Sequence, residues 1–229
     1  MIRGFGTLDL GELAVRLKSI DIYDRRGNVV WWDDFEGTNL KWETNGTGTG
    51  WEVALNTASP FTGSQCVKLT TGDAVDDVAI ISYNLAKPPL ERLGIEYTFS
   101  SEVWLKYYEV GATIWTGSKR YDGQIRYDNN NDKLQYLNSS NSYTDFATNV
   151  KIAEELAAYY TIKFVIDLSA EKYVRCTFID KSYDLSSYSL YSSSSSVSPR
   201  LTTMFRITAG DIDGRVCYVD NFILTQNEP

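Results

Sequence analysis

The chain has 229 residues, with 22 Lys and Arg against 30 Asp and Glu, a formal net charge of −8 and no histidine. The absence of histidine excludes a Ser-His-Asp triad, a Cys-His dyad and a histidine metal site. The acidic balance argues against a nucleic-acid binder, which needs a basic surface for the phosphates. With 43% hydrophobic residues, 16 Tyr, 9 Phe and 6 Trp, the chain has ample aromatic surface for a folded, strand-rich core.

The N-terminal residues lack the apolar core of a signal peptide, because Asp9 and Glu12 interrupt the hydrophobic residues there. No stretch approaches the roughly 20 apolar residues of a membrane span. We therefore expect a virion or cytoplasmic assembly as the location, with no membrane span. The three cysteines, Cys66, Cys176 and Cys217, lie in strand-like segments and are expected to be buried free thiols.

Residues 1–30 differ in pattern from the rest and are interpreted as an N-terminal arm that packs on the main body or extends from it. Residues 7–19 (TLDLGELAVRLKS) predict a short helix, although Gly11 weakens it. Residues 19–24 and 28–35 are rich in β-branched and aromatic residues and flank a Gly-Asn pair. This arrangement predicts a hairpin.

From residue 31 to 229 the pattern is one of about a dozen short segments, separated by Gly, Asn, Asp, Ser or Pro. Several alternate in polarity: Ile162 and Phe164 share one face with Lys163 on the other, and Val174 and Cys176 likewise share a face. The spacing predicts an all-β domain, an antiparallel sandwich of two sheets. Residues 152–158 predict a short helix over one end, and the serine run 192–196 predicts a flexible loop.

Three stretches carry a family resemblance. They are DDFEG at 33–37 followed by KWE and GW, GSQCVKLTTG at 63–72, and CYVDNFILT at 217–225. Their order resembles the jelly-roll carbohydrate-binding modules and their concanavalin A-like relatives, over residues 31–229. The resemblance implies a jelly-roll sandwich in which the first and last strands pair.

The RRGN segment followed by DDFE also resembles proteins of phage or phage-like origin. That resemblance implies a non-catalytic structural protein of a phage or virus-like particle, such as a capsid decoration or appendage protein. Its partners would be further copies of itself and other virion or assembly proteins, with affinity for glycans in addition. A free-standing carbohydrate-binding module is the alternative, and a glycoside-cleaving enzyme is a weaker one.

The pairing of first and last strands would bring Asp220 near Asp33, Asp34 and Glu36. Carboxylate oxygens are ligands that Ca²⁺ prefers, and the resemblance implies a structural Ca²⁺ at this corner. Ordinary turn chemistry is the alternative, since Asp accepts hydrogen bonds from nearby backbone N–H groups. No other cofactor is expected.

Aromatic residues between 115 and 143 supply the candidate glycan site. Flat rings stack on sugar faces and polar side chains hydrogen-bond the hydroxyls, as the resemblance implies. The predicted cluster is Trp115, Tyr121, Arg126, Tyr127 and Tyr136. The alternative is that these rings fill the core between the sheets or a subunit contact.

The sequence offers little support for a catalytic site. A retaining glycosidase of this fold would need paired carboxylates on one strand face, in a Glu-x-Asp-x-x-Glu run, and the sequence has no such run. A phosphate loop of the Walker type is also missing. The sequence therefore predicts a protein that is not an enzyme.

Overall fold

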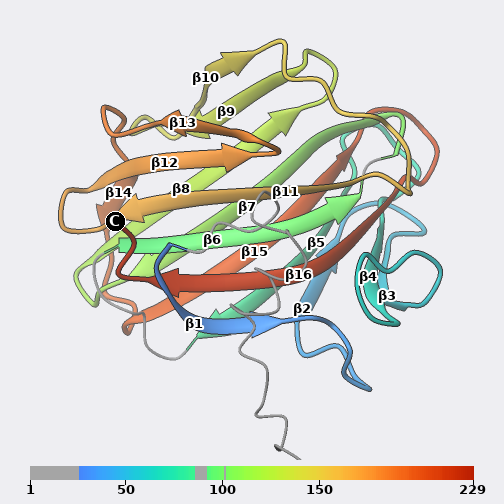
Figure 1. Ribbon diagram of the computed structural model, residues 1–229, viewed down its shortest axis with the longest axis horizontal. Helices are drawn as coiled ribbons and strands as arrows, with labels where there is room; N and C mark the ends of the chain where they lie inside the picture. Colours follow the sequence, from blue (N-terminus) through green and yellow to red (C-terminus); the bar gives the residue numbers. More distant parts are fainter. Residues whose placement is uncertain (1–25, 86–91, 101) are drawn as a thin grey trace, which may run out of the picture.

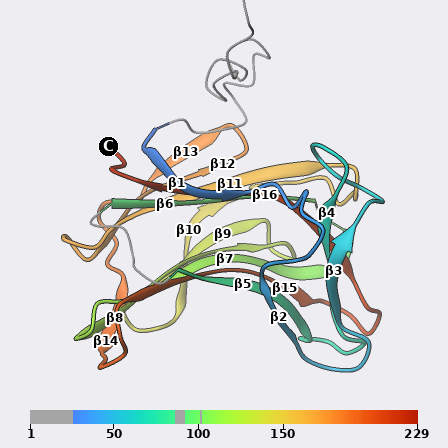
Figure 2. The ribbon, with the colours of Figure 1, turned by 90° about the horizontal axis from the view of Figure 1, so that it is seen from below.

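The computed structural model describes residues 26–85, 92–100 and 102–229, and these form an antiparallel β-sandwich of two sheets. Figure 1 shows the strands of one sheet crossing in front of the other, and Figure 2 shows the two sheets stacked as layers. The predicted all-β, jelly-roll sandwich is confirmed. In the part of the chain that the structure describes, no helix has the length and apolarity needed to cross a membrane.

The first sheet has eight strands, in the order β13-β12-β11-β6-β16-β4-β3, with β1 also paired to β16. In chain order these strands are β1 (Asn28–Asp33), β3 (Glu52–Asn56), β4 (Cys66–Thr70), β6 (Arg92–Ser100), β11 (Tyr159–Asp167), β12 (Lys172–Phe178), β13 (Lys181–Asp184) and β16 (Val216–Gln226). Strand β16 is central, because it pairs with β6 on one side and with both β4 and β1 on the other.

The second sheet also has eight strands, in the order β10-β9-β8-β7-β15-β5-β2, with β14 paired to β8. In chain order these strands are β2 (Glu43–Gly46), β5 (Val78–Leu85), β7 (Leu105–Trp115), β8 (Lys119–Asp128), β9 (Lys133–Leu137), β10 (Tyr143–Thr148), β14 (Tyr191–Ser194) and β15 (Arg200–Ala209). Strand β7 lies in the middle, between β8 and β15.

The predicted pairing of the first and last sandwich strands is confirmed, since β1 runs antiparallel to β16 with Asp33 opposite Phe222. Strand β1 begins at Asn28, three residues before the predicted start of the domain at 31. The arm's helix and the first half of its hairpin lie outside the described residues and stay predictions.

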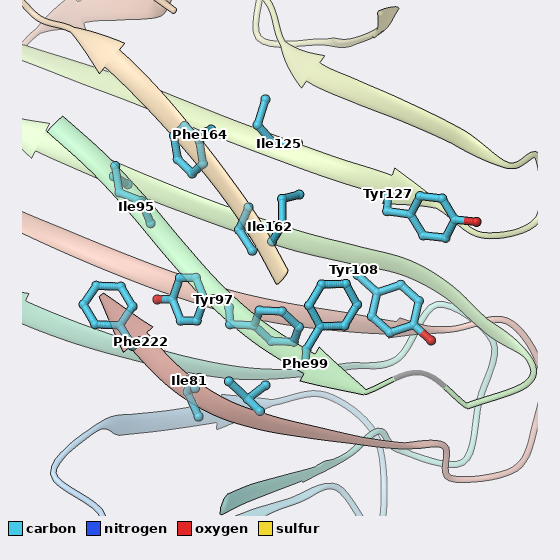
Figure 3. Close-up of a cluster of buried hydrophobic side chains, with 14 of the residues drawn as sticks. Ile81, Ile95, Tyr97, Phe99, Tyr108, Ile125, Tyr127, Ile162, Phe164 and Phe222 are labelled. Carbon is cyan, nitrogen blue, oxygen red and sulfur yellow. The ribbon is translucent and has the colours of Figure 1, made fainter. Parts of the chain in front are cut away.

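Aromatic rings from both sheets meet between the layers and form the core. Tyr97 and Phe99 of β6 contact Phe205 of β15 with ring centroids 5.5 and 5.3 Å apart, and Tyr97 packs at 4.7 Å on Phe222 of β16. Figure 3 shows Tyr97, Phe99 and Phe222 with aliphatic side chains around them. Burial of this surface, at roughly 25 cal/mol per Å², holds the two layers together.

The predicted alternation is confirmed in β11, where Ile162 and Phe164 are buried in the core. Lys163 points to the opposite side of the sheet, where it is also buried and forms an ion pair with Glu228 at 2.7 Å. The three cysteines are buried and free, as predicted.

Three local predictions are wrong. Residues 152–158 form no helix but an extended segment with a turn, closed by the Ala158 N–H donating to the Glu155 carbonyl. Residues 192–194 of the serine run belong to strand β14, which pairs with β8, and do not form a flexible loop. The prediction that Val174 shares the inner face with Cys176 is also wrong. The pairing of β11 with β12 has a register shift at this point, and the bulge turns Tyr173 into the core in place of Val174.

Replacing Phe222 by Ala should lower the free energy of unfolding by about 3–5 kcal/mol, because the ring packs on Trp31, Trp42 and Tyr97 and its loss leaves a cavity. Urea unfolding followed by tryptophan fluorescence measures the change. Ile212→Ala is the matched control, since Ile212 is exposed and its loss should cost less than about 0.5 kcal/mol. Equal losses in both variants would contradict this description of the core.

Candidate functional site

Strand β7 carries two different rows of side chains because neighbouring residues in a strand point to opposite faces. The inner row is buried against the first sheet and consists of Tyr108, Val110, Ala112 and Ile114. The other row lies on the side of the second sheet that faces away from the first, which we call the outer face. From β7 it presents Tyr107, Glu109, Gly111, Thr113 and Trp115.

The structure divides the five residues of the predicted glycan cluster between the two faces. Tyr121, Tyr127 and Tyr136 are only 7%, 1% and 8% exposed. Tyr127 and Tyr136 belong to the core cluster, and Figure 3 shows Tyr127 among the core rings. The prediction that these tyrosines share a binding surface with Trp115 and Arg126 is therefore wrong. Trp115 and Arg126 lie together on the outer face.

Trp115 lies at one end of the outward row of β7, between two arginines. In the sheet register it is opposite Arg200 of β15 and opposite Arg120 of β8. The guanidinium carbons lie 4.3 Å (Arg200) and 5.8 Å (Arg120) from the Trp115 ring centroid, within cation–π range. Arg120 also pairs with Asp122 at 2.9 Å.

Arg126 of β8 lies near the other end of this row, between two tyrosine rings. Its guanidinium carbon is 4.0 Å from the centroid of Tyr107 and 3.7 Å from that of Tyr143. The Nε atom donates to Gln135 Oε1 at 2.8 Å. Two rings and one hydrogen bond therefore fix the plane and direction of this guanidinium.

The partners of Arg126 are themselves held in place. Gln135 Nε2 donates to Asp145 at 2.6 Å, and Lys133 pairs with the same carboxylate at 2.7 Å. Hydrogen bonds from Lys133 and Gln135 hold the pKa of Asp145 below its ordinary value, so it is ionised at neutral pH. Burial raises the pKa of the Tyr143 phenol, which stays protonated and donates to Gln124 Oε1 at 2.8 Å.

The middle of the outward row is Gly111, which has no side chain. A Cβ there would lie 3.0 Å from Gln124 Cγ and 3.1 Å from Met204 Cε, closer than most real contacts. The neighbouring Glu109 is buried and forms an ion pair with Arg206 of β15. The centre of the row is therefore covered by the side chains of Gln124 and Met204, and a ring lies at each end.

Sequence reasoning missed Tyr107, Tyr143 and Arg200. Tyr107 could have been found, because it lies eight residues before Trp115 in one strand and an even spacing puts both on one face. Tyr143 and Arg200 lie on other strands, β10 and β15, and only the pairing of strands brings them beside Arg126 and Trp115.

The four predicted metal ligands do not come together. Asp33 accepts hydrogen bonds from the Phe35 N–H and from Trp42 Nε1, and Asp34 accepts one from the Glu36 N–H. Among the residues that the structure describes, no group of three or more Asp, Glu or Cys side chains is arranged to hold a metal ion. For Asp33 and Asp34, the structure fits the turn-chemistry alternative.

Glu36 and Asp220 do converge on one loop, residues 59–65. Glu36 accepts hydrogen bonds from the N–H groups of Ser64 and Gln65, and Asp220 Oδ2 accepts from those of Phe61 and Thr62. Asp220 Oδ1 is buried and has no hydrogen-bond partner within the described residues. Burial raises the pKa of Asp220 to about 6. An unpaired carboxylate oxygen beside a second carboxylate is the one feature here that fits a cation.

Comparison with solved structures gives the same fold at low sequence identity. A "Cellulose induced protein, Cip1" has a TM-score of 0.54 at 15% identity, covering 86% of this chain and 97% of that chain. The carbohydrate recognition domain of Emp46p, in potassium-bound form, has a TM-score of 0.53 at 11% identity, covering 85% and 98%. An endo-β-1,4-glucuronan lyase from the fungus Trichoderma reesei has a TM-score of 0.52 at 13% identity, covering 86% and 95%. No protein-family model and no curated protein matches the sequence.

The structural Ca²⁺ stays a prediction, and its remaining ligand candidates are Glu36 and Asp220. If the ion binds, millimolar Ca²⁺ should raise the melting temperature of the metal-stripped protein and a chelator should reverse the shift. Asp220→Asn should abolish the shift, whereas Asp34→Asn should leave it unchanged because Asp34 is not at the 59–65 loop. If calorimetry shows that the melting temperature does not change with Ca²⁺, the prediction of a structural Ca²⁺ is wrong.

Proposed function

We propose that the outer face of the second sheet is a glycan-binding surface and that this protein binds sugars without cleaving them. The observation that carries the proposal is the outward row of β7, with Trp115 and Arg200 at one end and Tyr107 and Arg126 at the other. The guanidinium groups donate hydrogen bonds to sugar oxygens, and the parts of the rings that the guanidinium groups leave uncovered offer apolar contact.

The dimensions of the row suit an extended ligand. Tyr107 and Trp115 are eight positions apart in β7, which at roughly 3.3 Å per residue is about 26 Å. At the midpoint Gly111 has no side chain and is covered by the side chains of Gln124 and Met204, so β7 itself places no ring between Tyr107 and Trp115. A saccharide of several units fits this surface better than a single sugar does.

The proposal that the face does not catalyse a reaction rests on the state of its carboxylates. Glu109 is buried against Arg206, and Asp122 accepts hydrogen bonds from Arg120 and Thr113. A glycosidase needs one carboxylic acid to protonate the leaving group and a second carboxylate to act as nucleophile or base. Each of these two groups already has a partner within the protein, and so has Asp145, which binds Lys133 and Gln135.

Two further features support the proposal that the outer face binds sugars. The fold is shared with a protein named as a carbohydrate recognition domain and with one named as a glucuronan lyase. The aromatic and arginine residues of the outer face are also fixed by contacts within the second sheet, which reduces the entropy lost on binding.

On a glycan array that includes neutral and acidic saccharides, the wild-type protein should bind, and Trp115→Ala should weaken binding about tenfold or more through the loss of ring contact. The matched control is Trp104→Ala, because Trp104 is 61% exposed but lies in the loop between β6 and β7, outside the outer face. An array with no signal would overturn the proposal, as would equal losses in the two variants. Bound saccharides incubated with the protein should show no new reducing ends or unsaturated products.

The predicted structural role in a phage-like particle stays a prediction, and one feature favours assembly of copies. Strand β1 lies at a sheet edge and, within the described residues, pairs only with β16. Val29, Val30 and Trp32 of this strand are exposed, with Trp32 at 47%, whereas Trp31 packs into the core on Tyr83. An apolar edge strand is a template for pairing with another chain.

If β1 mediates assembly, the wild-type protein should scatter light as a multimer at micromolar concentration, and Trp32→Lys should shift the mass toward that of one chain. Ile212→Lys is the control, since it adds the same charge at an exposed apolar residue away from β1. A monomeric wild-type protein, or a variant with unchanged mass, would contradict this role for β1.

A further inference from the structure

The charges of the outer face are not balanced within it. Four arginines point to this face: two have acidic partners, with Arg120 paired to Asp122 and Arg206 paired to Glu109. The other two, Arg126 and Arg200, form no ion pair in the described part of the chain, although the chain as a whole has eight more acidic than basic residues. Arg126 acts at longer range on Asp145, a carboxylate that already pairs with Lys133. Cations left unpaired in an acidic protein indicate a negatively charged ligand.

The guanidinium of Arg126 is held in an orientation that leaves donors available to such a ligand. Its two faces are covered by Tyr107 and Tyr143 and its Nε is bonded to Gln135, so the terminal nitrogens are the remaining donors. Within the described residues neither terminal nitrogen has a hydrogen-bond partner, and the side chain is only half-buried. A fixed planar guanidinium with a free edge matches the two oxygens of a carboxylate.

Arg200 repeats the arrangement at the other end of the row. It is exposed and lies over the Trp115 ring at 4.3 Å. Arg200 is opposite Trp115, and Arg126 is opposite Glu109, so the two arginines are offset by six positions of β7. At roughly 3.3 Å per residue the offset is about 20 Å, which is longer than one sugar unit.

We infer that the glycan is a chain containing uronic acid units, an inference that rests on the proposed function. Arg126 and Arg200 each bind a carboxylate on a different unit. Tyr107 and Trp115 hold the two guanidinium groups in place, and the chain crosses the surface between them over Gln124 and Met204. The negative charge comes from sugar carboxylates, because one carboxylate offers two coplanar acceptors to each planar guanidinium.

The test compares pairs of oligosaccharides that have the same linkage and length and differ only at C6. One pair is β-1,4-linked glucuronic acid and glucose, and another is β-1,4-linked mannuronic acid and mannose. Isothermal titration calorimetry should show that the wild-type protein binds the acidic member of at least one pair about tenfold or more tightly, as expected for charge-assisted bidentate bonds. Arg126→Gln and Arg200→Gln should each reduce this preference, and the double variant should abolish it.

Arg126→Lys retains the positive charge but not the planar fork, so it should also lose most of the preference. The control is Arg92→Gln, which removes one positive charge from the first sheet, where Arg92 pairs with Asp167, and should leave the preference unchanged. Circular dichroism melts confirm that each variant is folded.

The outcomes separate this inference from the proposed function. Equal affinity for the acidic and neutral members, with binding still lost in Trp115→Ala, overturns the uronic acid inference and leaves the glycan-binding proposal standing. A preference that persists in the double arginine variant, or that extends equally to a sulfated neutral oligosaccharide, also overturns it. Failure to bind any saccharide overturns both.

Discussion

The packing of aromatic side chains between the two sheets decides what the rest of the molecule can do. Because Tyr97, Phe99 and Phe222 of the first sheet must meet Tyr108 and Phe205 of the second, each strand has one face committed to the core. The opposite face of every strand is then determined, since successive side chains alternate. The outer face of β7 exists because Tyr108, Val110, Ala112 and Ile114 are needed inside.

The outer face uses the same rings and charges in another way. Arginine gives up part of its hydration when it lies between two rings, and cation–π contact offsets that cost by about 0.5–2 kcal/mol. The chain from Arg126 through Gln135 to Asp145 and Lys133 adds a second layer of support across β8, β9 and β10. Such support lowers the entropic cost of ordering a long side chain when a ligand binds.

The net charge of −8 and an anionic ligand are compatible because charge acts locally. At physiological ionic strength the Debye length is about 8 Å, so acidic residues on distant loops are largely screened from the outer face. Nearby, Glu109 and Asp122 are already neutralised by Arg206 and Arg120. The guanidinium groups of Arg126 and Arg200, which form no ion pair, are therefore the local charges available to a ligand on this surface.

The sequence by itself determined the class of fold, because alternation and turn spacing follow directly from strand geometry. The family resemblance implied the pairing of β1 with β16, which the structure has. Alternation could also have removed Tyr127 from the predicted cluster, since neighbouring residues of β8 such as Arg126 and Tyr127 cannot share a face.

Only the tertiary structure decided which residues form the site and which carboxylates stay apart. Tyr143 and Arg200 lie far from β7 in the chain and reach Arg126 and Trp115 through the order of strands in the sheet, which no local pattern encodes. In the same way, Asp33 is held by the Trp42 indole, and the bulge in β12 exchanges Tyr173 for Val174 in the core. Periodicity specifies the face of a strand, but the partner across that face depends on how the whole chain packs.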